Sequence, residues 1–356
     1  MVPNPILGVF LHWLGGLASA SFYVPYRKIT GWSWETYWLA GGVVSWIVAP
    51  WVMAGILTHD LIPVLRETPA SVVWWAYFFG VLWGMGGLTF GLTMRYLGLS
   101  LGMAVALGYT AVFGTLMPPI FHGEFGTLMN SHSGSVILIG VGVCVLGILF
   151  GGAAGISKDK ELSPEQQKAD IPEFNLKLGL IIATFCGVMS ACMAFGLDAG
   201  KAINVLTMQH GTSAVWSGLP VLIVVLSGGF TTNFVWCMIL NYRNKSFGEY
   251  KRIPIGKAIG ASIGRNYILS AVAGFTWYLQ FFFYTMGESQ MGKYGFSSWT
   301  LHMASIIIFS TLWGIGLNEW KGAGGRTRLL VAFSLLVLVS STVIVGYGNY
   351  IGGASR

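Results

Sequence analysis

Residues 277–303 read WYLQFFFYTMGESQMGKYGFSSWTLHM, and the fold class can be inferred from these residues and their surroundings. The stretch belongs to a segment, 274–319, in which two apolar runs are separated by a short polar link at 288–294. Each run is long enough to cross a bilayer. Gln280 and His302 lie within the runs, where a polar side chain costs free energy unless it has a partner. The segment therefore predicts two membrane helices whose polar positions face a bundle interior or a wet cavity.

Each of the two runs carries a stripe of rings and hydrogen-bonding groups. Trp277, Gln280 and Tyr284 lie at i, i+3 and i+7, which places them on one helical face. His302 and Ser305 share a face of the second run. Two such stripes without a fixed charge at their centre suit a neutral, polyhydroxylated ligand. For any single residue, a packed aromatic face with a hydrogen-bonded histidine explains the pattern equally well. The two stripes together favour a binding site.

The whole chain has the composition of a polytopic membrane protein. Hydrophobic residues make up 54% of its 356 residues and charged residues only 9%, which leaves too little polar surface for a soluble domain of this size. The apolar runs are continuous rather than alternating, which excludes an outer-membrane barrel. The first run lacks a preceding basic region and a cleavage site, so we expect a retained helix. A span needs about 20 apolar residues, and ten stretches qualify: 5–26, 36–57, 72–94, 100–121, 134–153, 176–197, 212–239, 264–287, 297–317 and 328–350.

The basic residues indicate how these stretches are oriented. Most of the 20 Lys and Arg residues fall in the loops that follow the odd-numbered stretches, and such residues accumulate on the cytoplasmic side. Both termini are therefore expected to be periplasmic, in a multi-pass protein of the cell inner membrane. The net charge of +7 then reflects topology and contact with the lipid bilayer, and no nucleic-acid partner is expected.

A polar linker at 157–175 divides the ten stretches into five and five. We expect a first five-helix repeat at 1–156 and a second at 176–356. Because five is odd, a tandem duplication places the second copy upside down, as in many secondary transporters. Three short motifs recur in the same order in the two halves: Gly16-x-x-Ser19 and Gly187-x-x-Ser190, Gly80-x-x-Trp83 and Gly274-x-x-Trp277, Phe113-x-Thr-Leu and Phe309-x-Thr-Leu. The sequence predicts an all-α membrane protein made of two inverted repeats.

Four titratable residues fall toward the expected outer side: His12, Asp198, Glu288 and His302. Such a cluster at one mouth would let a proton-coupled carrier load from outside. Histidine suits this task because its unperturbed pKa lies near neutrality. A hydrated vestibule would give the same pattern, and for His12 a structural histidine bonded to a neighbouring carbonyl is the alternative.

One further carboxyl group, that of Glu35, lies in WSWETYW (32–38) near the expected inner surface. Ser33 predicts an N-cap there, and the helix dipole favours an anion in the first turn. Glu35 is therefore expected to be structural, with a role as an inner coupling carboxylate as the alternative.

This chain lacks the residues that several classes of protein need. No stretch holds Lys or Arg at its middle, which disfavours carriers of organic phosphates and nucleotide sugars. The first stretch lacks the mid-membrane carboxylate of a cationic-drug exporter. No Walker motif or His-Glu-x-x-His pattern supports ATP drive or an enzyme, and the four Cys show no metal or disulfide spacing. We therefore expect no cofactor and no metal, but a neutral solute moved by an ion gradient.

Eight segments carry a resemblance to a known family: HWLGGLASASFYVPYRK (12–28), WSWETYW (32–38), FGLTMRYLGLSLG (90–102), GTLMPPI (114–120), EFNLKLGL (173–180), WYLQFFFY (277–284), LHM (301–303) and EWKGAGGR (319–326). In these segments the chain resembles the L-rhamnose–proton symporter family of the drug/metabolite transporter superfamily. The resemblance implies an inner-membrane carrier of ten helices, in which spans one, three, four, six, eight and nine line the cavity. It further implies uptake of L-rhamnose with protons.

The sequence thus leads to one hypothesis, an importer of L-rhamnose or a close 6-deoxyhexose that works by proton symport and alternating access, with H⁺ favoured over Na⁺. The alternatives are an exporter of another small neutral metabolite or amino acid, and a membrane sugar sensor that does not transport. The oligomeric state is left open. The expected sugar contacts are Ser19, Trp83, Tyr109, Trp277, Gln280, Tyr284 and His302. The candidates for proton coupling are His12, His302, Glu288, Asp198 and Glu35.

Overall fold

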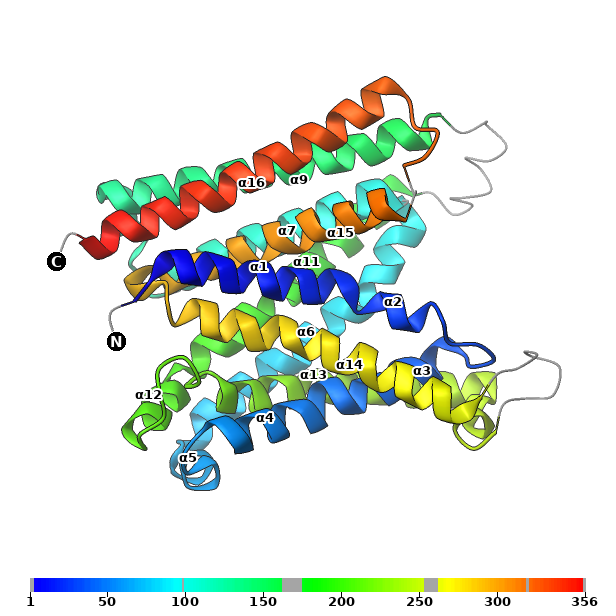
Figure 1. Cartoon of the computed structure of the whole chain (residues 1–356), viewed down its shortest axis with the longest axis horizontal. Helices are drawn as coiled ribbons and strands as arrows, with labels where there is room; N and C mark the ends of the chain where they lie inside the picture. Colours follow the sequence, from blue (N-terminus) through cyan, green and yellow to red (C-terminus); the bar gives the residue numbers. More distant parts are fainter. Residues whose placement is uncertain (1–2, 98, 162–174, 253–261, 318–319, 355–356) are drawn as a thin grey trace.

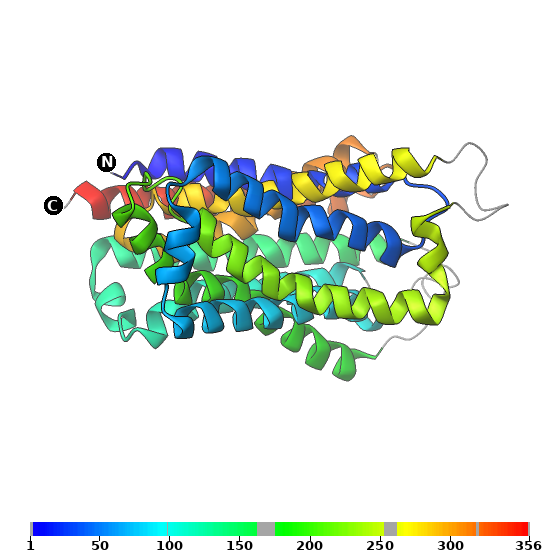
Figure 2. The same cartoon turned by 90° about the horizontal axis from the view of Figure 1, so that it is seen from below.

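The computed structural model describes residues 3–97, 99–161, 175–252, 262–317 and 320–354. Within these ranges the chain is helical and contains no strand. The long helices run roughly side by side along one axis (Figure 1) and form more than one layer when the bundle is turned (Figure 2). The beginning of the first helix and the end of the last lie at the same end of the bundle, which we call the terminal end.

The first half of the chain begins with a capped helix. The Asn4 side chain accepts a hydrogen bond from the Leu7 N–H, and Pro5 occupies the first helical turn, where its missing N–H is tolerated. The helices of this half are α1 (Pro5–Ser21), α2 (Tyr23–Tyr26), α3 (Trp34–Val43), the π-helical turn η1 (Val44–Val48), α4 (Ala49–Leu57), α5 (Leu61–Glu67), α6 (Ala70–Leu97), α7 (Leu99–Phe121), α8 (Phe125–Asn130) and α9 (His132–Asp159).

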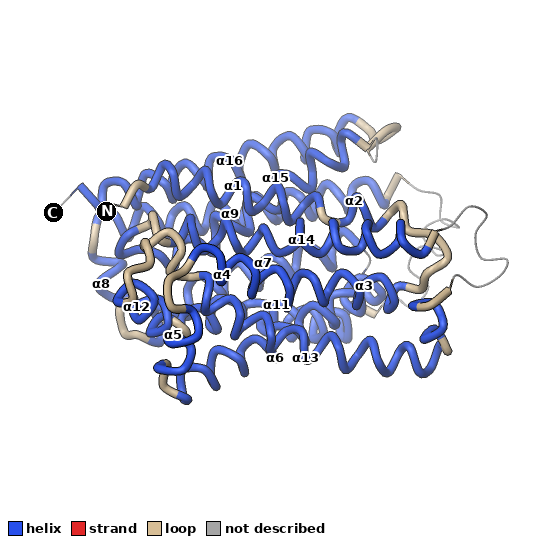
Figure 3. The backbone as a smooth tube through the Cα atoms, turned by 60° about the horizontal axis from the view of Figure 1, so that its bottom comes forward, coloured by secondary structure: helices blue, strands red, loops and turns tan. Residues whose placement is uncertain are grey.

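The second half begins in the same way, with the Asn175 side chain accepting from the Leu178 N–H. Its helices are α11 (Leu176–Ala199), α12 (Lys201–Gln209), α13 (Leu219–Asn244), η2 (Ser246–Tyr250), α14 (Ile263–Glu288), η3 (Gly292–Ser297), α15 (Ser298–Gly316) and α16 (Gly325–Ala354). The short helices α5, α8 and α12 all lie at the terminal end (Figure 3).

Eight helices of the described chain are long and apolar enough to cross a membrane, and a shorter apolar helix runs over Val105–Phe121. Helix α14 is not among the eight, although its 26 residues are enough to span a bilayer. It contains the polar residues Gln280 and Glu288, which lower its hydropathy. The prediction of membrane helices is therefore confirmed, and the count of ten goes beyond what length and composition establish.

The packing partners of the helices occur in matched pairs. Helix α1 packs against α14 and α15, and α11 packs against α6 and α7. Helices α9 and α16 run along each other at one side of the bundle (Figure 1). Two close approaches depend on glycine. A Cβ on Gly80 of α6 would clash with the backbone of α13 near Gly228, and a Cβ on Gly274 of α14 would clash with the backbone of α3 at Gly41.

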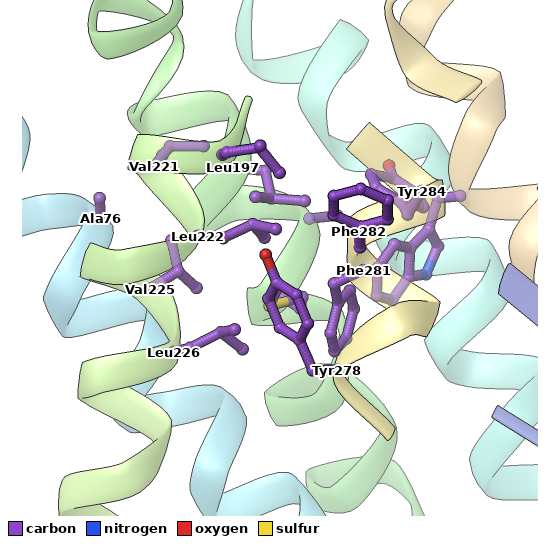
Figure 4. Close-up of a cluster of buried hydrophobic side chains, with 14 of the residues drawn as sticks. Ala76, Leu197, Val221, Leu222, Val225, Leu226, Tyr278, Phe281, Phe282 and Tyr284 are labelled. Carbon is purple, nitrogen blue, oxygen red and sulfur yellow. The ribbon is translucent and has the colours of Figure 1, made fainter. Parts of the chain in front are cut away.

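Part of the core lies between α14 and α13. Figure 4 shows Tyr278, Phe281 and Phe282 of α14 turned toward apolar side chains of α13 and α11. These neighbours include Leu222, Val225 and Leu226 on α13 and Leu197 on α11, all of them buried. Burying such side chains holds the inner faces of the helices together.

The structure places one expected helix, the start of the expected linker and one expected cap differently. The stretch predicted at 212–239 is helical over Leu219–Asn244, because 212–218 contribute only turns before Pro220. The predicted linker at 157–175 falls mostly on 162–174, outside the described residues, while 157–159 belong to α9. Ser33 occupies the N-cap position of α3, but its side chain makes no capping bond. The cap comes instead from a carboxylate far along the chain.

Candidate functional site

The centre of the bundle holds a cluster of aromatic rings from three elements. Trp83 on α6 and Trp277 on α14 have ring centroids 5.7 Å apart. Phe281 contacts both edge-on, 5.7 Å from Trp83 and 5.3 Å from Trp277. Trp46, carried by the π-helical turn, stands edge-on to Trp277 at 5.4 Å. We call these four residues the central ring cluster. Its rings present flat apolar faces near the middle of α6 and α14.

A buried amide lies beside this cluster. Gln280 follows Trp277 by one turn of α14 and is 5% exposed. Among the described residues its side chain has no hydrogen-bond partner, although its backbone carbonyl lies close to Gly15 of α1. An amide can donate two hydrogen bonds and accept two. Gln280 therefore offers unused hydrogen-bonding capacity inside the bundle.

Two histidine rings contact one tyrosine, Tyr284, which lies one turn of α14 beyond Gln280. The rings of His12 on α1 and His302 on α15 each stand edge-on to Tyr284, with centroids 5.3 Å away. Both histidines are fully buried or nearly so, and none of their four ring nitrogens has a hydrogen-bond partner within the described chain. Buried polar atoms normally have partners. The layer His12–Tyr284–His302 therefore offers four ring nitrogens to water or to a polar ligand.

Trp299 is a ring of this layer that the sequence reading missed. It lies edge-on to Tyr284 at 5.8 Å, and its indole N–H donates to the Thr110 carbonyl of α7 over 2.9 Å. Gly114, one turn further along α7, leaves room for this indole. Trp299 therefore joins α15 to α7 across the two halves of the chain. Only its position three residues before His302 could have suggested it.

A cavity of about 230 Å³ opens at the terminal end. We call it the terminal cavity. Its walls come from the end of α7, the starts of α12 and α13, the end of α14 and η3, and include Pro118, Pro119, Lys201, Asn204, Thr285, Glu288 and Phe296. Glu288 lies one helical turn beyond Tyr284. Its carboxylate has no hydrogen-bond or ion-pair partner among the described residues.

Asp198, in contrast, is already engaged. Its carboxylate forms an ion pair with the Lys201 ammonium and pairs with Nε2 of His122 at 2.7 Å. His122 and Lys201 line the terminal cavity. The structure thus brings Asp198 and Glu288 to the same end of the bundle, as expected, and adds His122, which sequence reasoning missed because a lone histidine in a short loop carries no pattern.

The chain matches known proteins along nearly its whole length. The model of the L-rhamnose-proton symport protein family matches residues 1–351. An L-rhamnose-proton symporter of Klebsiella pneumoniae (strain 342) is 37% identical over 343 residues, which is 96% of this chain and 97% of the relative. Those of Cronobacter sakazakii (strain ATCC BAA-894) and Escherichia coli (strain 55989 / EAEC) are 37% and 35% identical over the same shares. The chain belongs to the L-rhamnose-proton symport family. The predicted resemblance is confirmed, and the family is one of transporters, not of enzymes.

A second pocket of this symport-family chain is much smaller than the terminal cavity. It lies against the central ring cluster, on the side of Gly274. It holds about 10 Å³, room for roughly one water molecule. Trp277 and Trp46 line it together with Phe22, Tyr26 and Trp38. Of these two pockets, the larger therefore lies at the terminal end and the smaller beside Trp277 and Trp46.

Two other expected sugar contacts, Tyr109 and Ser19, lie away from the central ring cluster. The Cβ of Tyr109 packs where Gly187 of α11 leaves space, and its ring contacts Phe113 at 5.9 Å. Ser19 is half-buried on α1, and its hydroxyl makes no hydrogen bond within the described chain. Neither residue contacts the central ring cluster in this conformation.

Glu35 lies at the end of the bundle opposite the terminal end and is 3% exposed. Its carboxylate accepts hydrogen bonds from Ser246 at 2.7 Å and from Asn244 at 3.0 Å. The Glu249 carboxylate, from the second half of the chain, accepts hydrogen bonds from the Ser33 N–H at 2.6 Å and from the Ser33 and Thr36 hydroxyls in the first half. Glu249 thereby caps α3. The two carboxylates join α3 to the end of α13, which supports the structural interpretation of Glu35.

Proposed function

We propose that this family member imports L-rhamnose, or a close 6-deoxyhexose, together with protons by alternating access. The names of its relatives support this substrate and this ion. The observation that carries the proposal is the pair Trp83 and Trp277 beside the unpartnered amide of Gln280. A ring pair takes the apolar faces of a sugar, and the amide binds its hydroxyls.

The sugar site is built on the central ring cluster. Trp83 and Trp277 hold the sugar between their faces, and Gln280 donates to and accepts from its hydroxyls. Tyr284 and His302 close the site on the terminal side. Because the two indoles contact each other in this conformation, they separate when sugar enters. Ser19 and Tyr109 join the site only if α1 and α7 shift toward the rings, which alternating access allows.

A ten-span architecture of two inverted repeats fits this function. The matched packing of α1 on α14 and α15, and of α11 on α6 and α7, supports it. The glycines of the recurring motifs also have equivalent places. Gly16 of α1 abuts Ser305 of α15, and Gly187 of α11 abuts Tyr109 of α7. With both termini periplasmic, the terminal cavity faces the periplasm and the narrow pocket faces the cytoplasm.

The coupling proton is carried by groups that no other side chain of the described chain engages through a hydrogen bond or a direct ion pair. Among the candidates, Asp198 is engaged by Lys201 and His122, and Glu35 by Ser246 and Asn244. The ring nitrogens of His12 and His302 make no hydrogen bond within the described chain. The Glu288 carboxylate lines the terminal cavity near Lys201, without a direct ion pair among the described residues. We assign proton loading from the periplasm to Glu288 and transfer toward the sugar to the two histidines beside Tyr284.

Uptake by the purified protein in proteoliposomes tests this function. An inward pH gradient should drive accumulation of labelled L-rhamnose, and a sodium gradient at fixed pH should not. Uptake that follows sodium and ignores the pH gradient would overturn the choice of ion. Binding of L-rhamnose without any transport would identify a sensor. Accumulation of amino acids or other metabolites in place of the sugar would identify a carrier of another class.

A further inference from the structure

The terminal cavity has a chemistry of its own, separate from the central ring cluster. Both are lined by α14, but Thr285 and Glu288 face the cavity while Trp277 and Gln280 lie eight residues earlier. Trp277 and Thr285 are separated by about 12 Å along the helix, and the nearest pair, Gln280 and Thr285, by about 7.5 Å. The rings of Tyr284, His302 and Trp299 lie at the level between them. The two places are therefore treated as separate sites.

The cavity offers both kinds of hydrogen-bonding partner. Glu288 provides a carboxylate without a donor, and Lys201 an ammonium group whose position is set by Asp198. Asn204 adds an amide. Its Oδ1 is buried and finds no donor within the described chain. Hydrogen bonds from neutral hydroxyls to charged groups are stronger than those between neutral groups. This set of groups can bind several sugar hydroxyls without any net charge on the ligand.

Part of the cavity wall is apolar, and the remainder includes His122 and Glu124 besides the groups above. Pro118 and Pro119 at the end of α7 and Phe296 in η3 contribute rings to the lining. Small-ligand sites typically combine such apolar walls with a few polar groups that fix orientation. A 6-deoxyhexose carries a methyl group where an ordinary hexose carries a hydroxyl. The apolar wall therefore favours the deoxy sugar over its hydroxylated counterpart.

We propose that the terminal cavity is a second sugar site, which binds the neutral 6-deoxyhexose before it reaches the central rings. The proposal rests on the proposed function for the identity of the sugar. In the terminal site, Asn204 and Lys201 bind hydroxyls, Glu288 accepts from them, and Phe296 with the two prolines contacts the methyl side. Occupancy of this site raises the local concentration of sugar at the mouth of the passage.

A single reporter cysteine can detect sugar in the cavity. A Cβ on Gly295 would meet Glu288 Cγ at 3.6 Å, an ordinary contact, so Gly295→Cys places a thiol beside the site. The four native cysteines are buried and should not react with a membrane-impermeant maleimide. Labelling of the reporter is measured with and without L-rhamnose, at one fixed pH and without ion gradients. Ser289→Cys serves as a second reporter if Gly295→Cys does not fold.

Three backgrounds separate the terminal site from the central one. In Gln280→Ala, L-rhamnose should still slow labelling, with half-protection at nearly the unmodified concentration. In Asn204→Ala, half-protection should need about tenfold more sugar, as expected for the loss of hydrogen bonds to the ligand. Gln209→Ala is the matched control, because Gln209 is an exposed amide at the far end of the same helix.

The outcomes distinguish this proposal from the proposed function. If Gln280→Ala removes protection, or if Asn204→Ala leaves it unchanged, the cavity has no sugar site of its own and is only a hydrated vestibule. If L-mannose, the 6-hydroxy counterpart, protects as well as L-rhamnose, the role of the apolar wall is overturned. Failure of the proposed function itself shows differently, as no L-rhamnose transport by the unmodified protein, whatever the labelling result.

Discussion

Trp83 and Trp277 meet at the centre of the bundle, with ring centroids 5.7 Å apart and ring planes inclined by 37°. Each lies three residues after a glycine that allows close helix packing, Gly80 in α6 and Gly274 in α14. The two tryptophans thus occupy equivalent places in two recurring motifs and face each other across the centre. A ligand that inserts between them contacts both halves of the protein, which is what a carrier with alternating access needs.

Replacing either central tryptophan with phenylalanine should weaken sugar binding. Trp277→Phe and Trp83→Phe keep an aromatic ring in the core but lose part of the stacking face, so the KM for L-rhamnose uptake should rise by about threefold to tenfold. Trp74→Phe is the control, because Trp74 lies on the same helix and is 59% exposed. Unchanged uptake in both central variants would contradict the placement of the site.

Removing the buried amide should weaken sugar recognition. Gln280→Ala deletes hydrogen bonds to sugar hydroxyls, and we expect the Kd of the purified protein for L-rhamnose to rise by about tenfold. Binding is measured calorimetrically. Val272→Ala, a change at an exposed position of the same helix, should leave the Kd unaltered. If both binding and uptake survive in Gln280→Ala, the sugar lies elsewhere.

Removing the unpartnered carboxylate of the terminal cavity should separate sugar movement from proton movement. Glu288→Gln cannot load a proton, so accumulation driven by a pH gradient should be lost while exchange of labelled for unlabelled L-rhamnose continues. The same pair of assays applies to His12→Gln and His302→Gln. Glu67→Gln, which changes a carboxylate at the terminal end outside the cavity, should keep both activities. Normal accumulation by Glu288→Gln would remove this residue from the coupling path.

A histidine on the surface of the terminal end should make stability depend on pH. Its ring nitrogens pair with Glu67 at 3.0 Å and with Asp60 at 3.3 Å, and these two carboxylates raise the pKa of His210. A raised pKa in the folded state stabilises the protein below the unfolded value of about 6.5, and this stabilisation is lost as pH rises through the folded pKa. His210→Ala should therefore lower the Tm in detergent more at about pH 6 than at about pH 9. An equal Tm shift at both pH values would show that the two carboxylates do not favour protonation of His210 in the folded protein.

The carboxylate that caps α3 should contribute to stability. Glu249→Gln weakens bonds from the Ser33 N–H and from two hydroxyls in a buried place, and we expect a loss of about 2 kcal/mol. The Tm in detergent gives the measurement. Glu124→Gln is the control, because this exposed carboxylate makes no capping bond at the start of α8. A Tm equal to that of the unmodified protein would mean that Ser33 or water replaces the cap.

Some of the arrangement of these residues could be predicted from local patterns. The spacing of Trp277, Gln280 and Tyr284 predicted one shared face on α14, and all three lie within the bundle. The position of Glu288 and Asp198 near helix ends predicted a common end. The pattern could not tell that Asp198 pairs with His122, or that Glu35 is held by Ser246 and Asn244, because hydrogen bonds between distant segments leave no local signal.

The membrane class, the helical faces and the family follow from the amino-acid sequence, because composition and helical period act within each segment. Which rings meet depends on the packing of the helices. Trp46 reaches Trp277 because a π-helical turn carries it, and Trp299 joins the histidine layer because Gly114 on another helix makes room. Contacts of this kind depend on how closely two helices can approach and on the angle at which they cross. Those quantities arise from the packing of the whole bundle, not from any one stretch of the chain.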